Sequence, residues 1–369
     1  MTPEPTPARR YARIRYRLLL ADLGGSLGLL AILQSSGVSH AVAHWWSHRV
    51  VSPSAALLGY LAVVGAVYYL AMLPLHVFSS LLLEHRFGLS RLTVKGWLIR
   101  EAKRVSISAG LGIVLVEGLY ALLRHAPHSW PIWATIGWVG FTVILARIFP
   151  TVVLPLFYKI SPLQDPALVN RLLDLCRRTG LSALGVFQFQ LGAETRKANA
   201  ALAGLGASRR VLLSDTLLEA FTPEEIEGVL AHELAHHRRH HMTKLLILSA
   251  IGSWIVFTIT DAVGPIWVES LGLAGLADIA GFPMLALWLS GLGVIGLPLQ
   301  NGLSRYFEWQ ADRDAVRTTG FPQAFASALR RLARLNLADP EPPAWVAWIF
   351  SDHPPITQRI QAAEASHGI

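Results

Sequence analysis

The longest uncharged stretch of the chain runs from Val50 to Leu83 and contains no Asp, Glu, Lys or Arg. About 20 apolar residues are enough for a helix to cross the hydrocarbon core of a bilayer, so this stretch can span it with tilt. Only 15% of the 369 residues are charged and 53% are hydrophobic, whereas roughly 25% of a soluble globular protein is charged. We therefore predict a protein embedded in a lipid bilayer.

Six apolar stretches predict six membrane-spanning helices. They lie at Leu18–Leu33, Val50–Leu83, Val105–Leu123, Trp130–Tyr158, Leu245–Ile266 and Ile279–Leu303. Lys and Arg residues gather before the first stretch, within residues 84–104 and after Arg305. Since such residues favour the cytoplasmic side of a membrane, we expect both termini and the polar insertion 161–241 to be cytoplasmic. The predicted fold is an all-α polytopic membrane protein with about six transmembrane helices and a cytoplasmic α+β domain.

The polar insertion carries the signals of short helices and strands. Asp165 followed by Pro166 is typical of a helix start, and alternating residues predict strands at Gly185–Leu191 and Arg210–Ser214. Thr222 opens the next helix as part of a capping box, and we expect that helix to continue through His241 almost directly into the fifth span. We divide the chain into a four-helix membrane region 1–160, a cytoplasmic subdomain 161–242, two spans in 243–304 and a cytoplasmic C-terminal part 305–369.

Charge and cysteine content exclude several classes of protein. The net charge of +8 comes from basic residues beside apolar runs, and the chain has no nucleic-acid-binding module, so we expect no nucleic acid partner. Cys176 is the only cysteine, which excludes an intrachain disulfide and a thiolate metal cluster.

The segment His232-Glu233-Leu234-Ala235-His236 carries the chemistry. Four residues advance about 400° around a helix and about 6 Å along it, so the two histidines share one face and can hold a single metal ion. Glu233 lies on the flank of that face, where a carboxylate can take a proton from a water on the metal. The pattern predicts a Zn²⁺ site that hydrolyses peptide bonds, against the alternative of a chance match on a polar helix.

A zinc hydrolase needs three protein ligands and one open position, so a third ligand is required. Glu308 and Asp312 lie just beyond the sixth span, where the chain returns to the cytoplasmic side. They are four residues apart and share a helix face, so one can bind the metal while the other orients a ligand imidazole. The spacing does not decide which residue has which role.

The chain resembles the zinc-dependent CAAX prenyl endopeptidase family, which is related to the HtpX-like membrane proteases. The resemblance rests on matching segments in collinear order over roughly three quarters of the chain. These segments are Glu84–Ser90, Leu154–Lys159, Val211–Leu218, His232–His236, Ser304–Asp312 and His353–Arg359.

The resemblance implies a zincin-like catalytic domain with one Zn²⁺ per chain. His232, His236 and Glu308 would bind the zinc, Glu233 would act as general base and later acid, and Asp312 would support a ligand. Asn199 would lie beside the substrate backbone. His353 and Arg359, in the pattern His-Pro-Pro-x-x-x-Arg, would face the scissile carbonyl, and both types of side chain can donate to an oxyanion.

Two features depart from the family pattern. Ala201 stands where an aromatic residue usually follows the Asn-Ala pair. Eukaryotic members have seven spans, and this chain lacks one before Val50, which would invert the N-terminus and keep the catalytic domain cytoplasmic.

The predicted function is that of a membrane zinc metalloendopeptidase acting on membrane-associated or lipidated, CAAX-like substrates. We expect a protein of a bacterial inner membrane, because the composition is rich in Arg, Ala and Leu, and we take a monomer as the default. One alternative is a catalytically silent membrane chaperone or binding chamber with a structural zinc. A transporter, suggested by the charges at Asp22, Glu117, Arg147 and Asp261, is the other.

Overall fold

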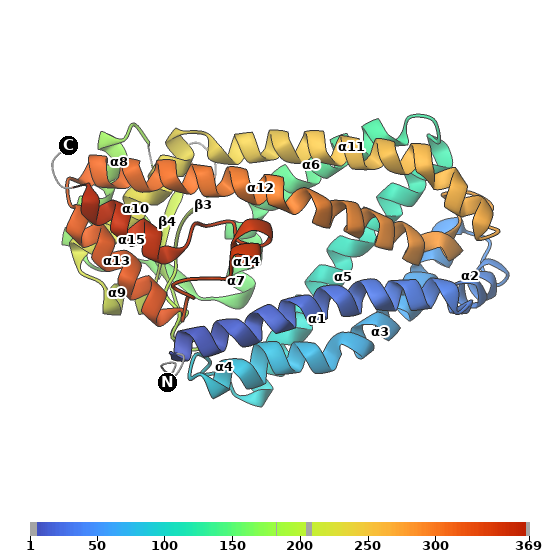
Figure 1. The fold of residues 1–369 in the computed structure, drawn as a ribbon, viewed down its shortest axis with the longest axis horizontal. Coiled ribbons are helices and arrows are strands. Elements are labelled where there is room, and N and C mark those ends of the chain that lie inside the picture. Colours follow the sequence, from blue (N-terminus) through green and yellow to red (C-terminus); the bar gives the residue numbers. More distant parts are fainter. Residues whose placement is uncertain (1–5, 182, 204–208, 367–369) are drawn as a thin grey trace.

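The computed structural model describes residues 6–366, apart from residue 182 and residues 204–208. Six helical segments are long and apolar enough to span a membrane (Figure 1), and they coincide with the six predicted spans. They are built from α1 (Pro7–Ser35), α3 (Pro53–Val77) with η1 (Phe78–Leu82) and α4 (Leu83–Arg86), α5 (Val94–His125), α6 (Trp130–Ile148) with η2 (Phe149–Val153) and α7 (Leu154–Phe157), α11 (His241–Ser270), and η4 (Ile279–Gly281) with α12 (Phe282–Thr319).

The spans converge at the end of the molecule away from the soluble elements (Figure 1). A buried apolar cluster at this end includes Tyr60, Tyr120 and Trp130. The helix α2 (Val38–Ser47) packs here; its 10 residues are too few to cross a bilayer. Ser39 donates to the carbonyl of Ala280 and shares a hydrogen bond with the Tyr60 hydroxyl, each at 2.7 Å, so these buried polar groups are satisfied without water.

The charged residues inside the spans do not form one cluster. Asp261 accepts a hydrogen bond from the indole of Trp130 at 2.7 Å. Glu117 lies 3.7 Å from Arg124, and Asp22 lies 3.6 Å from His76. Because these contacts lie apart, they do not form the shared binding site that the transporter alternative requires.

The soluble domain contains a four-stranded sheet in the order β1-β2-β4-β3. Its strands are β1 (Ile160–Pro162), β2 (Val186–Phe189), β3 (Ala200–Ala203) and β4 (Arg210–Ser214). β2 and β4 are parallel and lie where strands were predicted, whereas both outer strands were missed. β3 consists of three alanines and one leucine, so its strand state comes from antiparallel pairing with β4 rather than from β-propensity.

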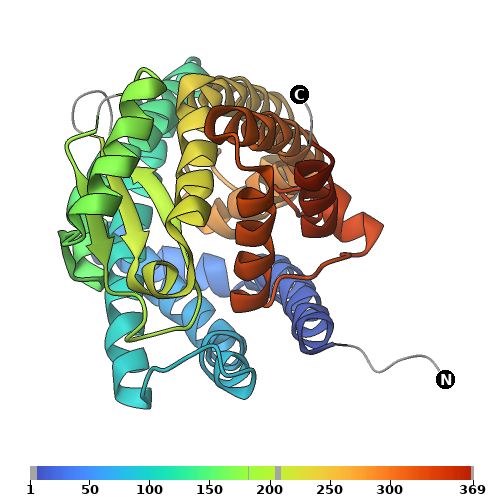
Figure 2. The ribbon, with the colours of Figure 1, turned by 90° about the vertical axis from the view of Figure 1, so that its left-hand side faces the viewer.

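The helices α8 (Pro166–Arg178), α9 (Asp215–Ala220) and α10 (Pro223–Arg238) pack against this sheet (Figure 2). With α13 (Pro322–Leu335), α15 (Ile356–Ala365) and the end of α12 they form the core of the soluble domain. The short helix α14 (Ala344–Ile349) packs against α12. As predicted, Asp165 caps α8 by accepting from two backbone N–H groups. Gly180, at φ +76°, follows the end of this helix.

The prediction of one helix through His241 is wrong. The helix α10 ends at Arg238, and His240 has a left-handed backbone with φ 56° before α11 begins. This break turns the chain, so that His241 packs back against His236. The predicted domain boundary at residues 304 and 305 lies inside the continuous helix α12; the division into four parts stays a prediction.

The capping box predicted at the start of α10 is present and extends beyond the helix. Glu225 Oε2 accepts from the backbone N–H of Thr222 at 2.9 Å, and its Oε1 accepts from Ser327 and Arg331 of α13 at 2.6 and 2.8 Å. Glu225 is 3% exposed. One carboxylate therefore caps α10 and joins it to α13.

We expect Glu225→Ala to lower the thermal midpoint of the full chain in detergent, because it removes the cap and leaves Arg331 without its buried partner. The loss of unfolding free energy is about 3 kcal/mol. Glu224→Ala is the matched control, since Glu224 is more exposed and pairs with Arg171 at the helix surface. Equal effects of the two substitutions would contradict this role of Glu225.

Candidate active site

Three predicted ligands meet at the junction of α10 and α12. His232 and His236 lie one turn apart on α10, and their Nε2 atoms are 3.1 Å apart. Glu308 on α12 places Oε2 3.4 Å from His232 Nε2 and Oε1 3.2 Å from His236 Nε2. The ligand atoms of all three residues lie within 4.8 Å of one another. Among the residues that the structure describes, this is the one such group of His, Cys, Asp or Glu.

The surroundings of Glu308 test whether a metal ion fits this group. Its Oε2 atom is buried and accepts no hydrogen bond from any described residue. Yet nitrogen atoms of His232, His353 and Arg359 surround that oxygen at 3.3–3.4 Å. A buried carboxylate oxygen without a hydrogen bond is costly, and a bound cation removes that cost. Two imidazoles and one carboxylate are also a donor set typical of catalytic zinc sites.

Asp312, on α12, contacts both the candidate ligand His232 and Arg359. Its Oδ1 atom lies 2.9 Å from His232 Nδ1, the ring nitrogen directed away from the metal position. Arg359 on α15 donates from Nε to Oδ2 at 2.8 Å and from Nη2 to Oδ1 at 2.7 Å. Asp312 and Arg359 are both buried, so this bidentate pair is shielded from solvent.

His353 approaches the same group from the loop before α15. Its Nε2 atom lies 3.4 Å from Glu308 Oε2, and its Nδ1 atom pairs with Asp352 at 2.7 Å. That hydrogen bond raises the pKa of His353. The side chain is 53% exposed, unlike those of the ligands, so its ring is accessible to a bound molecule.

His236 has a supporting residue that sequence reasoning missed. His241 Nδ1 lies 3.0 Å from His236 Nδ1, and its Nε2 lies 3.0 Å from the side-chain oxygen of Gln310. The His241 ring also stacks on Phe307 at a centroid distance of 4.2 Å. The signal in the sequence was the histidine run after His236, but only the left-handed turn at His240 brings His241 back to the site.

Glu233 lies on α10 beside the three candidate ligands and is partly buried. Burial raises its pKa, and the neighbouring His232 and His236 act in the opposite direction. A carboxylate with a raised pKa is a better proton acceptor than an exposed one. The group can therefore hold one divalent cation beside a candidate general base.

Asn199 lies immediately before β3, and no contact between it and the three candidate ligands is present among the described residues. Its carbonyl accepts from Ser214 N–H of β4 at 2.9 Å, and its side chain is exposed. Because alternate residues of a strand point their backbone groups to opposite sides, Ala200 and Leu202 direct theirs toward the free edge of β3. His237 of α10 contacts this edge of β3, with its Nε2 atom 3.2 Å from the Leu202 carbonyl.

Asn336 is a second residue that sequence reasoning missed. It caps the C-terminus of α13 and meets Ala198, just before β3. Its side-chain oxygen accepts from Ala198 N–H at 3.1 Å, and its amide donates to the Ala198 carbonyl at 3.4 Å. The Asn336 side chain thus pairs with the outer side of the chain at this point as a neighbouring strand would. No sequence pattern connects these distant residues.

Two family profiles match the chain. The profile of peptidase family M48 matches residues 162–367, and that of the CAAX prenyl protease N-terminal region, described as five membrane helices, matches residues 6–159. The latter region contains four of the long spans and the short helix α2.

Curated proteins and a solved structure are similar over most of the chain. An uncharacterized metalloprotease, YhfN of Bacillus subtilis, is 26% identical over 361 residues, 97% of this chain and 84% of that protein. CAAX prenyl protease 1 of Saccharomyces cerevisiae is 26% identical over 336 residues, 86% of this chain and 74% of that protein. The crystal structure of S. mikatae Ste24p has a TM-score of 0.85 over 97% of this chain and 88% of that chain at 23% identity, which shows a shared fold.

We expect Asp312→Asn to weaken metal binding by about 10- to 100-fold, because it removes the charge that faces His232 and Arg359. Competition with a fluorescent chelator measures this affinity. The control is Asp314→Asn on the same helix, since Asp314 pairs with Arg238 and Arg239 outside the ligand group. Unchanged metal affinity in Asp312→Asn would contradict the supporting role of Asp312.

Proposed function

This chain belongs to peptidase family M48 and is a membrane metalloprotease, and we propose that its metal is one Zn²⁺ bound by His232, His236 and Glu308. The observation that carries this proposal is the convergence of the three side chains from α10 and α12 with Glu233 beside them. Their donor set suits zinc and leaves a fourth position open. A catalytically silent chaperone gains no support, since a structural zinc would need neither an open position nor an adjacent base.

The proposed chemistry is hydrolysis of a peptide bond. His232, His236 and Glu308 would hold a Zn²⁺ that would supply Lewis-acid polarisation of the scissile carbonyl and a lowered pKa for the attacking water. Glu233 accepts the proton of the attacking water and delivers it to the nitrogen of the leaving amine. Its position immediately after His232 keeps the carboxylate beside the reacting group throughout both transfers.

We assign different parts of this chemistry to the residues around Glu308. The exposed ring of His353 lies closest to a bound substrate and donates from Nε2 to the oxyanion that forms at the scissile carbonyl. Arg359 uses two of its nitrogens on Asp312, while Nη1 remains 3.3 Å from Glu308. It adds positive charge beside the carbonyl and keeps Asp312 in place, and Asp312 in turn orients His232.

The proposed substrate binds as an extended strand on the free edge of β3, with the Asn199 side chain beside its backbone. Ala200 offers one N–H and one carbonyl at this edge, and Leu202 offers its N–H. The Leu202 carbonyl is taken by His237, and the Ala198 groups are taken by Asn336. Only a short segment of substrate can therefore pair with β3. The substrate must turn away from this edge at the position that the Asn336 side chain occupies.

We propose membrane-associated or lipidated peptides, including CAAX-like substrates, as the substrate class. The names of the curated relatives support prenylated substrates, and the position of the site at the end of membrane span α12 supports substrates held at the bilayer. The distribution of Lys and Arg supports a cytoplasmic catalytic domain. The Arg-, Ala- and Leu-rich composition and the similarity to a Bacillus subtilis protein support a bacterial inner membrane. We propose that the chain acts as a monomer.

Glu233→Gln should retain its metal and lose cleavage, because the amide cannot accept the proton of the attacking water. We expect kcat/KM to fall at least about 100-fold. Elemental analysis of the purified protein and a quenched-fluorescent peptide assay measure the two properties. Glu219→Gln, an exposed residue of α9, is the matched control.

The same assay tests the metal itself. Chelation should abolish cleavage by the unaltered chain, and Zn²⁺ should restore it. Undiminished proteolysis by Glu233→Gln would remove this residue as the base, whereas activity that survives complete metal removal would overturn the metal mechanism as a whole.

Asn336→Ala should lengthen the segment of substrate that the β3 edge can pair with, because it frees the backbone groups of Ala198. In a series of peptides extended one residue at a time on either side of the cleaved bond, we expect one added residue to raise kcat/KM about fivefold to tenfold in the variant only. Asn336→Asp retains an oxygen for Ala198 N–H and should respond less. Identical length dependence in all three proteins would exclude Asn336 as the limit of the edge.

A further inference from the structure

Lys197, two residues before Asn199, joins the entry of β3 to the membrane spans. Its Nζ atom lies 2.8 Å from Glu84 Oε2, at the end of the second span. The hydroxyl of Tyr11, on α1, donates to Glu84 Oε1 and lies 3.4 Å from Lys197 Nζ. The side chain of Glu84 is only 13% exposed. Both oxygens of one largely buried carboxylate are therefore used, one on the first span and one on the segment that enters β3.

The loop after the second span also contacts this segment through its backbone. Gly88 has a left-handed backbone with φ +67°, and the N–H of Leu89 donates to the Glu84 carbonyl at 2.9 Å, so the loop turns tightly. The Leu89 carbonyl then accepts from the Thr195 hydroxyl at 2.8 Å. This contact holds the chain before β3 beside the end of the span, within reach of the Glu84 carboxylate.

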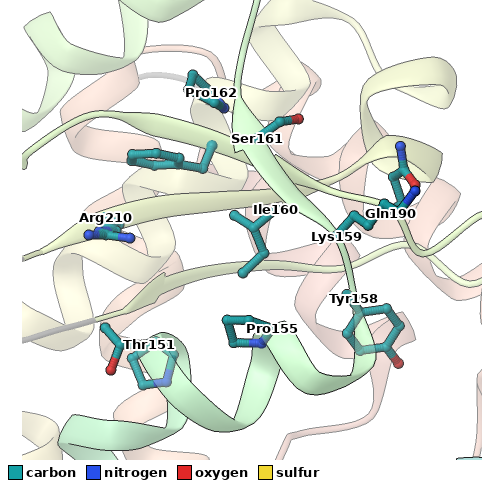
Figure 3. Close-up of a pocket in the computed structure, with 11 residues that line it drawn as sticks. Thr151, Pro155, Tyr158, Lys159, Ile160, Ser161, Pro162, Gln190 and Arg210 are labelled. Carbon is teal, nitrogen blue, oxygen red and sulfur yellow. The ribbon is translucent and has the colours of Figure 1, made fainter.

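The third span contacts the same segment, whereas the other outer strand faces a cavity. Arg100 of α5 pairs with Glu194 and donates to the hydroxyl of Tyr158. On the far side of the sheet, β1 faces η2–α7 across a cavity of about 590 Å³, with Ile160 on the strand wall and Pro155 on the helical wall (Figure 3). The entry of β3 is thus held by direct contacts with the spans, whereas a cavity separates β1 from η2–α7.

The side chain that limits the free edge of β3 is held at the same place. Asn336, which pairs with the backbone of Ala198, is followed by Leu337. Leu337 packs against a buried apolar cluster that includes Tyr11. Tyr11 thus links Lys197 and the cluster that holds Leu337, on either side of the point where the free edge begins.

We propose that Glu84 and Tyr11 are positioning residues for the substrate, because they fix the β3 edge through Lys197. This inference rests on the proposed binding of substrate to that edge. Paired strands lie about 4.8 Å apart with N···O distances near about 2.9 Å, so a small displacement of Ala200 weakens the pairing. β3 has only four residues and pairs with β4 on one side, so its position depends on how its entry is held.

The test measures kcat and KM separately on the full-length purified protein, with the quenched-fluorescent peptide as substrate. Glu84→Gln keeps the size of the side chain and removes its charge. We expect KM to rise about fivefold with kcat and metal content unchanged, because substrate binding is weakened and the chemical step is not. Tyr11→Phe removes only the hydroxyl and should raise KM less. Glu341→Gln is the matched control: it removes an exposed ion pair of α1 with the soluble domain, that with Arg9, and should leave KM unchanged.

Exchanging the charges separates an effect of this pair from a general loss of stability. Glu84→Lys places two cations together and should raise KM further than Glu84→Gln does. Glu84→Lys/Lys197→Glu allows an ion pair to form again and should bring KM back toward that of the unaltered chain. Unchanged KM in both single variants of Glu84, or no recovery in the double variant, would overturn the inference. So would a fall in kcat or metal content at constant KM, which indicates a purely structural role.

Peptides methylated at one backbone nitrogen after another distinguish this inference from the proposed strand binding. In the unaltered chain, methylation of the nitrogen that donates to the Ala200 carbonyl should raise KM. In Glu84→Gln the same methylation should cost less, because the pairing is already weakened. If methylation at no position raises KM, strand binding itself is wrong. If methylation raises KM equally in both proteins, strand binding stands and the positioning role of Glu84 is overturned.

Discussion

The buried pair of Asp312 and Arg359 is the interaction on which the site depends. Two parallel hydrogen bonds join α12 to α15, and the same carboxylate faces His232 on α10. Removing one partner of such a pair leaves an uncompensated buried charge, which costs several kcal/mol. Three helices from distant parts of the sequence are thereby held in one arrangement, with Glu308 one turn before Asp312. The helix α15, far from α10 in the sequence, is consequently part of the candidate site.

The helix α12 connects the membrane-spanning region to the candidate active site. The helix α12 begins within the spans and ends at Thr319 in the soluble domain, and it carries Asn301, Glu308 and Asp312 along the way. Asn301 donates to the carbonyl of Ile349 at 2.6 Å, which holds α14 and the following loop with His353 near the same helix. Because α12 is one continuous helix, it ties the position of the candidate site to the end of a membrane span.

The two edges of the small sheet differ in what they can bind. The β3 edge lies beside α10 and keeps unpaired backbone groups only between the positions taken by Asn336 and His237. The β1 edge lies beside the end of a membrane span and forms one wall of a cavity. Both edges avoid open-ended strand pairing with other chains, one by side-chain blocking and the other by its length of three residues. The small sheet thus presents one edge to the candidate active site and the other to a membrane span.

The sequence by itself determined the membrane class, the six spans and the helix that carries the two candidate histidine ligands, because these depend on local properties. Uncharged runs, the capping box at Thr222 and the spacing of His232 and His236 are each readable within one segment. The order of matching segments also singled out Glu308, Asp312, His353 and Arg359. The structure places these four residues beside His232 and His236. Their catalytic roles stay predictions.

Only the tertiary structure decided which groups support and limit the site. The alanine-rich β3 is a strand because β4 pairs with it, and no local preference of its residues indicates this. The left-handed His240 brings His241 to His236, and the end of α13 brings Asn336 to Ala198. The contact of His241 depends on a chain reversal, and that of Asn336 joins residues 138 positions apart in the sequence. Their energies come from packing that exists once the fold has formed, so a one-dimensional pattern does not contain them.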